Sequence, residues 1–263
     1  MNKWRLIDSG NEDAYFNMAL DEAIAVHVQD HNCPPTLRFY GWNKKSITIG
    51  AFQSINDLNI QYCNERNIPV VRRPTGGRAI LHGNDLTYSF SSINSPPFFS
   101  EGLLQTYGFI SRAFLLAFRS LGMEVQMKNR KEKGKVLTGS SLCFQSVSYG
   151  EITLQGRKLI GSAQKRWKKG FLQQGSLMLK LEADEMKRVF KRVKADQILS
   201  SMTSVLEHYP QISTDLLKKE ITRAFEEVFS VRFIHDEPTR DELSLASRLV
   251  HEKYSSSEWL NYR

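Results

Sequence analysis

The sequence predicts an α+β protein in which mixed central sheets are flanked by helices. A strand-rich centre is flanked by a helical repeat over residues 12–29 and by the residues after about 182, which are mostly helical in pattern. With 263 residues, 41% of them hydrophobic, the chain can bury a substantial core. We expect one domain over residues 1–263, with a helix-rich C-terminal portion over about 182–263.

The first half of the chain alternates between helical and strand-like patterns. Apolar residues recur at helical spacing over residues 12–29, which predicts a helix. Runs rich in β-branched and aromatic residues predict strands. The elements expected next are strands over 36–42 and 46–52, a short helix over 57–66, a strand over 68–73 and a strand over 86–90.

The second half begins with a long amphipathic helix, for which Ser100 is the expected N-cap and Gly122 the glycine after its end. Apolar and polar residues alternate over 149–167 on both sides of Gln155-Gly156, which predicts a hairpin. Residues 171–181 predict one more strand. From Glu182 onward the pattern is mostly helical, with caps expected near Ser213 and Asp241.

Composition narrows the class of protein. No run of about 18 apolar residues or secretory leader pattern occurs, so we expect no membrane partner. Three cysteines, Cys33, Cys63 and Cys143, fit free thiols in a reducing compartment, and we expect a cytoplasmic protein. We expect no metal site and a monomer.

The formal charge of +8 and the pI of about 9.3 allow a nucleic acid, a membrane surface or an acidic protein as partner. Much of the charge lies in Lys128–Lys135 and Lys165–Lys169. Either segment can simply be solvated, but we expect both to favour docking of acidic proteins. No zinc-finger spacing or RNA-binding signature occurs, so a basic nucleic-acid-binding protein is only a remote alternative.

Two short motifs stand out. Residues 72–82 read RRPTGGRAILH, where Gly76 and Gly77 can turn tightly and approach a ligand closely. A plain hairpin turn is the alternative interpretation. The spacing is not that of a phosphate-binding P-loop. The second motif, GRKLIGSAQ (156–164), places Lys158 just after a turn and small residues beyond it, which leaves room for a ligand chain.

These motifs resemble those of the lipoate–protein ligase and octanoyltransferase superfamily, whose fold is shared with biotin protein ligase catalytic domains. RRPTGGRAILH is similar to the signature RR-x-[ST]-G-G-x-A-V-x-H, and GRKLIGSAQ to G-[RK]-K-[IL]-x-G-S-A. WRLIDSG, NMALDEA, LRFYGW and SITIGAFQ resemble the family's N-terminal pattern. The resemblance implies a tunnel for a medium-length acyl chain. Burying about seven apolar carbons contributes at most about 5–6 kcal/mol.

Two chemistries occur in this family, and the resemblance bears on the choice. Ligases use ATP to form an acyl-adenylate and carry an arginine-asparagine-aspartate sequence, which is missing near Cys143. Cysteine-dependent octanoyltransferases carry Cys-Phe at this place, with the motif lysine at the same interval. The resemblance therefore implies a transferase with Cys143 as nucleophile and Lys158 as its cationic partner, since a nearby cation favours the thiolate.

The remaining site residues follow from the same resemblance. His82 matches a motif histidine that is largely structural, with general-base catalysis as the alternative. The family usually has a histidine where this chain has Gln174, which cannot titrate, so a proton-transfer role at that place is in doubt. Three functions remain open for Arg72, Arg73 and Arg78: they can stabilise the fold, bind a nucleotide phosphate or bind an acidic protein. The expected substrate-binding residues are Arg73, Thr75, Gly76, Gly77, Arg78, Ala79, Leu81, His82, Gly161, Ser162 and Ala163.

The implied partners are octanoyl-acyl carrier protein as donor and lipoyl domains (GcvH or E2 subunits) as acceptors. No cofactor is expected for this transfer. An ATP- and magnesium-dependent lipoate or octanoate ligase remains an alternative, as does an amidotransferase that moves octanoyl between lipoyl domains.

Overall fold

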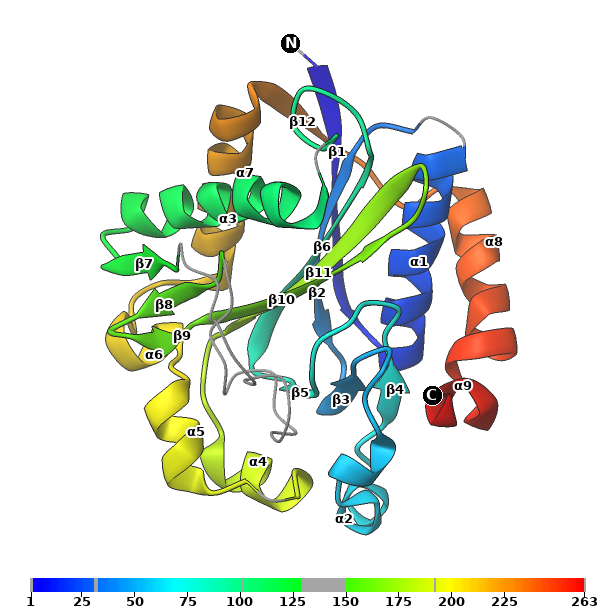
Figure 1. Ribbon diagram of the computed structural model, residues 1–263, viewed down its shortest axis with the longest axis vertical. Helices are drawn as coiled ribbons and strands as arrows, with labels where there is room; N and C mark the ends of the chain where they lie inside the picture. The colour runs from blue at the N-terminus through cyan, green and yellow to red at the C-terminus, as the bar shows by residue number, and fades with distance from the viewer. Residues whose placement is uncertain (1, 31–32, 101, 129–149, 192, 263) are drawn as a thin grey trace.

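A computed structural model describes residues 2–30, 33–100, 102–128, 150–191 and 193–262 (Figure 1). Its centre is a six-stranded mixed sheet with the order β10-β11-β6-β2-β1-β12. Strands β2 and β12 run parallel to β1, and the other neighbours are antiparallel. The strands are β1 (Asn2–Glu12), β2 (Thr36–Trp42), β6 (Asp85–Ile93), β10 (Ile160–Arg166), β11 (Gly170–Met178) and β12 (Val231–His235).

Helices cover both faces of this sheet (Figure 1). Helices α3 (Gly102–Ser120) and α7 (Thr214–Phe229) pack on one face, and α1 (Ala14–Asp30) with α8 (Arg240–Leu249) on the other. Successive side chains of a strand point to opposite faces. Accordingly, Leu6 of β1 belongs to the aromatic-rich cluster beneath α3 and α7, whereas Ile7 belongs to the cluster beneath α1.

Two small sheets flank the large one. The first has the order β4-β3-β5 and consists of β3 (Ser46–Ile49), β4 (Val70–Arg72) and β5 (Ile80–His82). The second consists of β7 (Val125–Met127), β8 (Ile152–Leu154) and β9 (Arg157–Lys158). The other elements are a 3-10 turn (Ile55–Asp57), α2 (Ile60–Glu65), α4 (Ala183–Val189), α5 (Ala195–Ser201), α6 (Val205–His208), a π-helical turn (Val250–Tyr254) and α9 (Ser257–Asn261).

The predicted fold class is confirmed, and so are most of the elements. The first helix and the strand over 36–42 are present, and Gly122 follows the long helix with a φ of +75°. Ser213 caps α7 as expected. For α8 the N-cap is Thr239, which forms a capping box with Glu242.

Two expectations need correction. The strand over 46–52 ends at Ile49, and the hairpin over 149–167 is much shorter than predicted. Only β8 and β9 pair around Gln155-Gly156, whose φ values of 51° and 77° suit a tight turn; the chain then moves to the six-stranded sheet as β10. The largely helical C-terminal portion also contributes β12, which pairs with β1. This pairing supports a single domain over 1–263, which stays a prediction.

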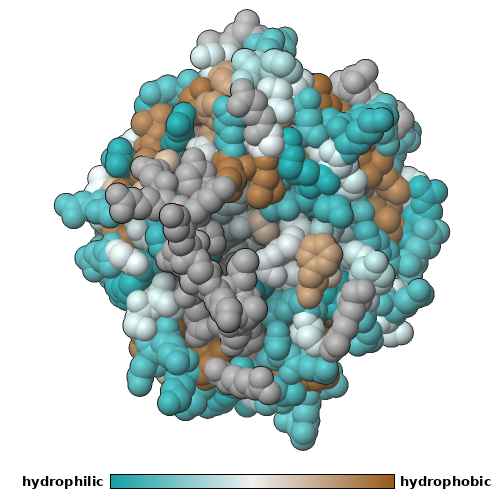
Figure 2. Space-filling model, viewed as in Figure 1, coloured by the Kyte–Doolittle hydropathy of each residue, from teal (hydrophilic) through white to brown (hydrophobic). Residues whose placement is uncertain are grey.

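The surface seen in Figure 2 is mostly hydrophilic, with hydrophobic residues in separate small groups. Within the described ranges, no helix has both the length and the apolar character needed to cross a membrane.

Candidate functional site

The segment between β4 and β5 carries the Gly-Gly motif and is not a hairpin turn. Strands β4 and β5 both pair with β3, one on each side, so residues 73–79 cross over the end of that strand. The close backbone approach is made by Gly50 and Gly77. A Cβ on Gly50 would lie 1.9 Å from the Gly77 carbonyl oxygen, whereas one on Gly76 would meet nothing within 4 Å.

Arg72 is buried, and its guanidinium holds the backbone around this crossing. It donates hydrogen bonds of 2.7–3.1 Å to carbonyl oxygens from two separate parts of the chain, residues 50–53 and residues 259–260. A guanidinium has five N–H donors, and these carbonyls accept from all three of its nitrogens. Of the three roles left open for this arginine, these contacts support the one in the fold.

Arg73 shapes the motif in a similar way. Its guanidinium donates to the carbonyl oxygens of Gly76 (2.7 Å) and Arg78 (2.8 Å) and to the Thr48 hydroxyl (3.1 Å). The side chain therefore holds the Gly-Gly turn closed from inside, while Arg78 itself is only half-buried.

A small cavity opens beside this turn, and its free interior of about 20 Å³ has room for about one water molecule. It brings together five of the expected substrate-binding residues: Arg73, His82, Gly161, Ser162 and Ala163. The other six do not contribute to its lining: Thr75, Gly76, Gly77, Arg78, Ala79 and Leu81.

The sequence did not indicate that the other lining residues come together. Tyr40 and Trp42 of β2 lie on one face of the strand because they are two residues apart. Met18 comes from α1, within the NMALDEA segment, and Ile80 from β5. The quoted N-terminal motifs contained Met18, Tyr40 and Trp42, but no spacing rule relates them to residues 161–163. The lining is completed by Thr48, Thr87, Gln174, Gly175 and Ser176.

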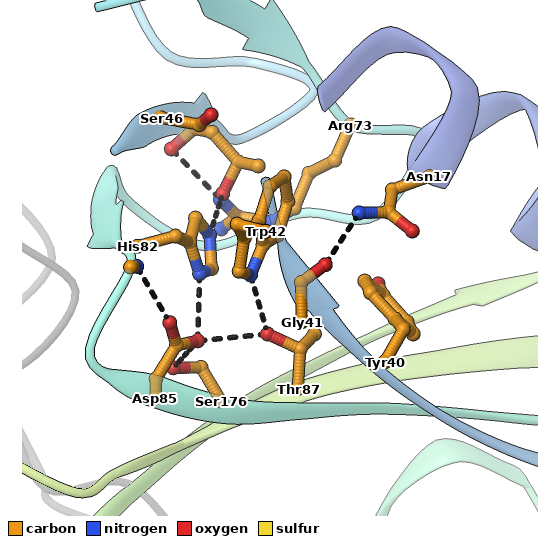
Figure 3. Close-up of polar contacts among 12 residues, drawn as sticks. Asn17, Tyr40, Gly41, Trp42, Ser46, Arg73, His82, Asp85, Thr87 and Ser176 are labelled. Carbon is orange, nitrogen blue, oxygen red and sulfur yellow. Dashed lines mark hydrogen bonds and ion pairs between the residues drawn. The ribbon is translucent and has the colours of Figure 1, made fainter. Parts of the chain in front are cut away.

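His82 lies in a buried polar cluster at one side of the cavity (Figure 3). Its Nδ1 is 2.8 Å from an Asp85 carboxylate oxygen, its Nε2 is 2.9 Å from the Thr48 hydroxyl, and the Trp42 ring stacks on it at 4.0 Å. These contacts hold the imidazole rigidly. Asp85 also accepts hydrogen bonds from Gly83, Thr87 and Ser176.

Burial by itself would raise the pKa of Asp85. The charge and hydrogen bond of His82, together with donors from Gly83 and Ser176, outweigh that effect and bring the pKa below its usual value. Asp85 is therefore an ionised anchor at neutral pH, with His82 oriented by it.

A second buried carboxylate, Asp21 of α1, joins the helix to three strands. It accepts hydrogen bonds of 2.6–2.7 Å from Arg38, Tyr40, Ser89 and Gln174. Burial, followed by the charge of Asp21, raises the pKa of Tyr40 well above its usual value, so this phenol remains a donor.

Gln174 connects this cluster to the Gly-Gly turn. Its amide nitrogen donates to Asp21 and its oxygen accepts from the Thr75 hydroxyl at 2.8 Å. The side chain therefore links α1, β11 and the turn by hydrogen bonds that need no change of protonation. This arrangement gives Gln174 a structural function, at the position where the family resemblance led us to expect a histidine.

Tyr88 packs behind two residues of the cavity lining, Ser162 and Gly175. The Tyr88 hydroxyl lies 2.9 Å from that of Ser162 and accepts from Gln173 at 2.9 Å. Burial raises the pKa of Tyr88 to about 12, although both hydrogen bonds lower it. A Cβ on Gly175 would lie 2.2 Å from the Tyr88 ring, so only glycine fits there.

Lys158, the expected cationic partner, is buried and forms an ion pair with Glu151. Sequence reasoning did not single out Glu151. Lys158 ends β9 and does not contribute to the cavity lining; its carbonyl accepts a hydrogen bond from Thr203 at 3.0 Å. Cys143 lies outside the described residues, so its relation to Lys158 stays a prediction. Among the residues that are described, no group of three His, Cys, Asp or Glu side chains could hold a metal ion.

Comparison with known proteins places these features in context. Residues 13–226 match the family model described as the lipoyl protein ligase A/B catalytic domain. The chain is 36% identical to octanoyltransferase LipM of Bacillus subtilis, over 99% of this chain and 98% of that one, and 33% identical to octanoyltransferase LipM of Moorella thermoacetica, with the same shares covered. A crystal structure of lipoate-protein ligase A bound with ATP is 25% identical and superposes with a TM-score of 0.82, over 99% of this chain and 98% of that one.

Proposed function

We propose an activity for this chain from the family to which it belongs, the lipoyl protein ligase A/B catalytic domain family: it is an octanoyltransferase, an acyltransferase of protein lipoylation. The observation that carries the proposal is the identity of 36% and 33% to two octanoyltransferases over nearly the whole chain. The cavity beside the Gly-Gly turn supports it, because Met18, Trp42 and Ile80 give an acyl chain apolar surface.

The reaction we assign has two steps. The Cys143 thiolate attacks the thioester carbonyl of octanoyl-acyl carrier protein, a new C–S bond forms, and the carrier leaves as a thiol after taking up a proton. The ε-amine of a lysine in a lipoyl domain (GcvH or E2) then attacks the octanoyl-cysteine thioester. An amide bond forms, the amine loses its proton, and the Cys143 thiol is regenerated.

Cys143 is the proposed nucleophile, and the described cysteines are poorer candidates. Burial raises the pKa of both Cys33 and Cys63, which lowers their thiolate fraction at neutral pH. Lys158 is the proposed cation beside the reacting carbonyl, and the N–H groups of residues 161–163, next to the cavity, are candidate donors to its oxyanion. The free thiols of Cys33 and Cys63 support a reducing, cytoplasmic setting.

We propose that this transfer needs no nucleotide. Arg72 and Arg73, the arginines that open the motif, direct their guanidinium groups at backbone carbonyls, which supports a role in the fold over one in phosphate binding. The ATP-dependent ligase is the second candidate, because the similar lipoate-protein ligase A binds ATP.

The deciding experiment is intact-protein mass spectrometry after mixing the protein with octanoyl-carrier protein, with and without ATP. We expect an octanoyl adduct without ATP that disappears in Cys143→Ser and persists in Cys33→Ser. A second reaction mixture contains a lipoyl domain as acceptor. If the lipoyl domain is octanoylated only when ATP and free octanoate are supplied, the result would instead favour the ligase. An adduct formed only from octanoyl-lipoyl domain would favour the amidotransferase.

A further inference from the structure

Two adjoining basic grooves lie on the surface formed by α2, α4 and α5. The first is lined by Lys187, Arg188, Lys191 and Lys194 together with Asn59, Phe190, Val193 and Gln197, and none of these described lining residues is acidic. Like charges on one surface repel each other, so such a groove is stabilised when an anionic partner covers it.

The second groove continues the first, because Arg188 lines both. Its other cations are Lys44, Lys45 and Arg66, with Glu185 as the acidic member of the lining. Lys45 also forms an ion pair of 3.0 Å with Glu182, whereas the described structure gives Lys44, Lys187 and Lys194 no ion pair.

The second groove leads toward the candidate site. Its Lys44-Lys45 turn immediately precedes β3, and Ser46 at the start of that strand is paired with His82, which lines the cavity. The Lys45 Cα lies 3.4 Å from where a Cβ on Gly83 would stand, so the turn packs directly against the end of β5. A partner seated on the grooves is thus brought beside the cavity.

The segments singled out in the sequence lie elsewhere. Lys165–Lys169 spans the end of β10 and the β10–β11 turn, where Lys169 pairs with Asp30 of α1. From Gly170 to Met178 strand β11 extends roughly 27 Å. The turn therefore lies at the opposite end of the sheet from α4, as Figure 1 shows. Of Lys128–Lys135, only Lys128 is among the described residues.

We propose that these two grooves form the docking surface for the acyl donor, an acidic carrier protein that presents its thioester to the neighbouring cavity. The proposal rests on the proposed octanoyltransferase activity. Charge complementarity identifies the partner: the two linings together hold seven basic residues and one acidic residue.

The test compares two charge-reversal variants with the same change in net charge. Lys187→Glu/Lys194→Glu alters the first groove, and Lys3→Glu/Lys219→Glu, two exposed lysines on β1 and α7 that line neither groove, is the matched control. Each is assayed with two donors, octanoyl-carrier protein and the uncharged small thioester octanoyl-N-acetylcysteamine. Both variants change exposed side chains, and thermal melting checks that their folds are intact.

We expect the groove variant to raise KM for octanoyl-carrier protein at least about tenfold at low salt, because attraction between opposite charges accelerates encounter by this factor or more. The increase should shrink as salt rises. Transfer from the small thioester should stay at the wild-type rate, and the control variant should change neither donor's KM by more than about twofold.

An unchanged KM for the carrier in the groove variant, or an equal increase in the control variant, would overturn the docking surface while leaving the activity established. Loss of transfer from the small thioester in the well-folded groove variant would also overturn it, since the grooves would then act on the chemistry. Failure of the wild-type protein to accept octanoyl from either donor would count against the proposed function itself.

Discussion

Lys158 and Glu151 form a buried ion pair across the tight β8–β9 turn, seven residues apart in the chain. Their side chains are 1% and 6% exposed. Removing one partner would leave the other charge buried and uncompensated, which is costly. The pairing means that Lys158→Ala alone does not separate a catalytic function of the lysine from a structural one.

A double-mutant cycle makes that separation. We expect Lys158→Met and Glu151→Leu each to lower the free energy of unfolding by about 3–5 kcal/mol, and the combined variant Lys158→Met/Glu151→Leu to lose much less than their sum. The double variant should fold but form the octanoyl-enzyme slowly, with a more alkaline pH profile, because Lys158 is the proposed activating cation. Urea denaturation and mass spectrometry measure the two effects. A well-folded double variant with wild-type acylation would remove Lys158 from the reaction.

Alanine substitutions at Gly50 and Gly76 form a matched pair that tests the close backbone approach at the Gly-Gly turn. Gly50→Ala places its methyl carbon 1.9 Å from the Gly77 carbonyl oxygen, whereas the same change at Gly76 meets open space. We expect Gly50→Ala to cost about 1–3 kcal/mol of stability and to slow acylation by shifting the turn beside the cavity. Gly76→Ala should remain within about 0.5 kcal/mol of wild type. Equal denaturation midpoints for the two variants would contradict the close approach.

The hydrogen bond from Thr75 to Gln174 can be tested at the hydroxyl. Thr75→Val keeps the shape but leaves the buried Gln174 oxygen without this donor, at a cost of about 1–3 kcal/mol. Thr75→Ser retains the donor and should recover most of that loss. Thermal unfolding measures both variants. Serine and valine variants of equal stability would show that packing, and not the hydrogen bond, holds the turn to β11.

The lowered pKa of Asp85 makes the free energy of unfolding depend on pH. Its pKa is lowered in the folded protein, so ionised Asp85 stabilises the fold above the unfolded-state pKa of about 4, and this contribution is lost as pH falls through the lower folded-state pKa. Asp85→Asn should cost about 1–3 kcal/mol at pH 7. The difference from wild type should shrink as pH falls below about 4. Urea denaturation across pH measures it, with the exposed Asp215→Asn as control. A difference that does not vary with pH would contradict the ionised anchor.

The sequence by itself determined the elements whose signals are local. Hydrogen bonds and side chains within a few residues determine the helical repeat of α1, the turn at Gln155-Gly156, the Gly122 that follows α3 and the Ser213 cap of α7. The motifs also identified the family and five residues of the cavity lining. The assignment of Cys143 and Lys158 to the reaction came from the resemblance to cysteine-dependent octanoyltransferases and is still a prediction.

Only the tertiary structure decided which distant residues meet. Gln174 reaches Asp21 across 153 positions, and Arg72 holds carbonyls near both residue 50 and residue 260. Strands β4 and β5 flank β3 because the small sheet buries its apolar face against α4 and α5, which no turn signal encodes. Likewise, the basic residues that gather along two grooves are scattered from Lys44 to Lys194 in the chain. Periodicity reports which face of an element is buried; the order of strands and the packing of helices determine what that face contacts.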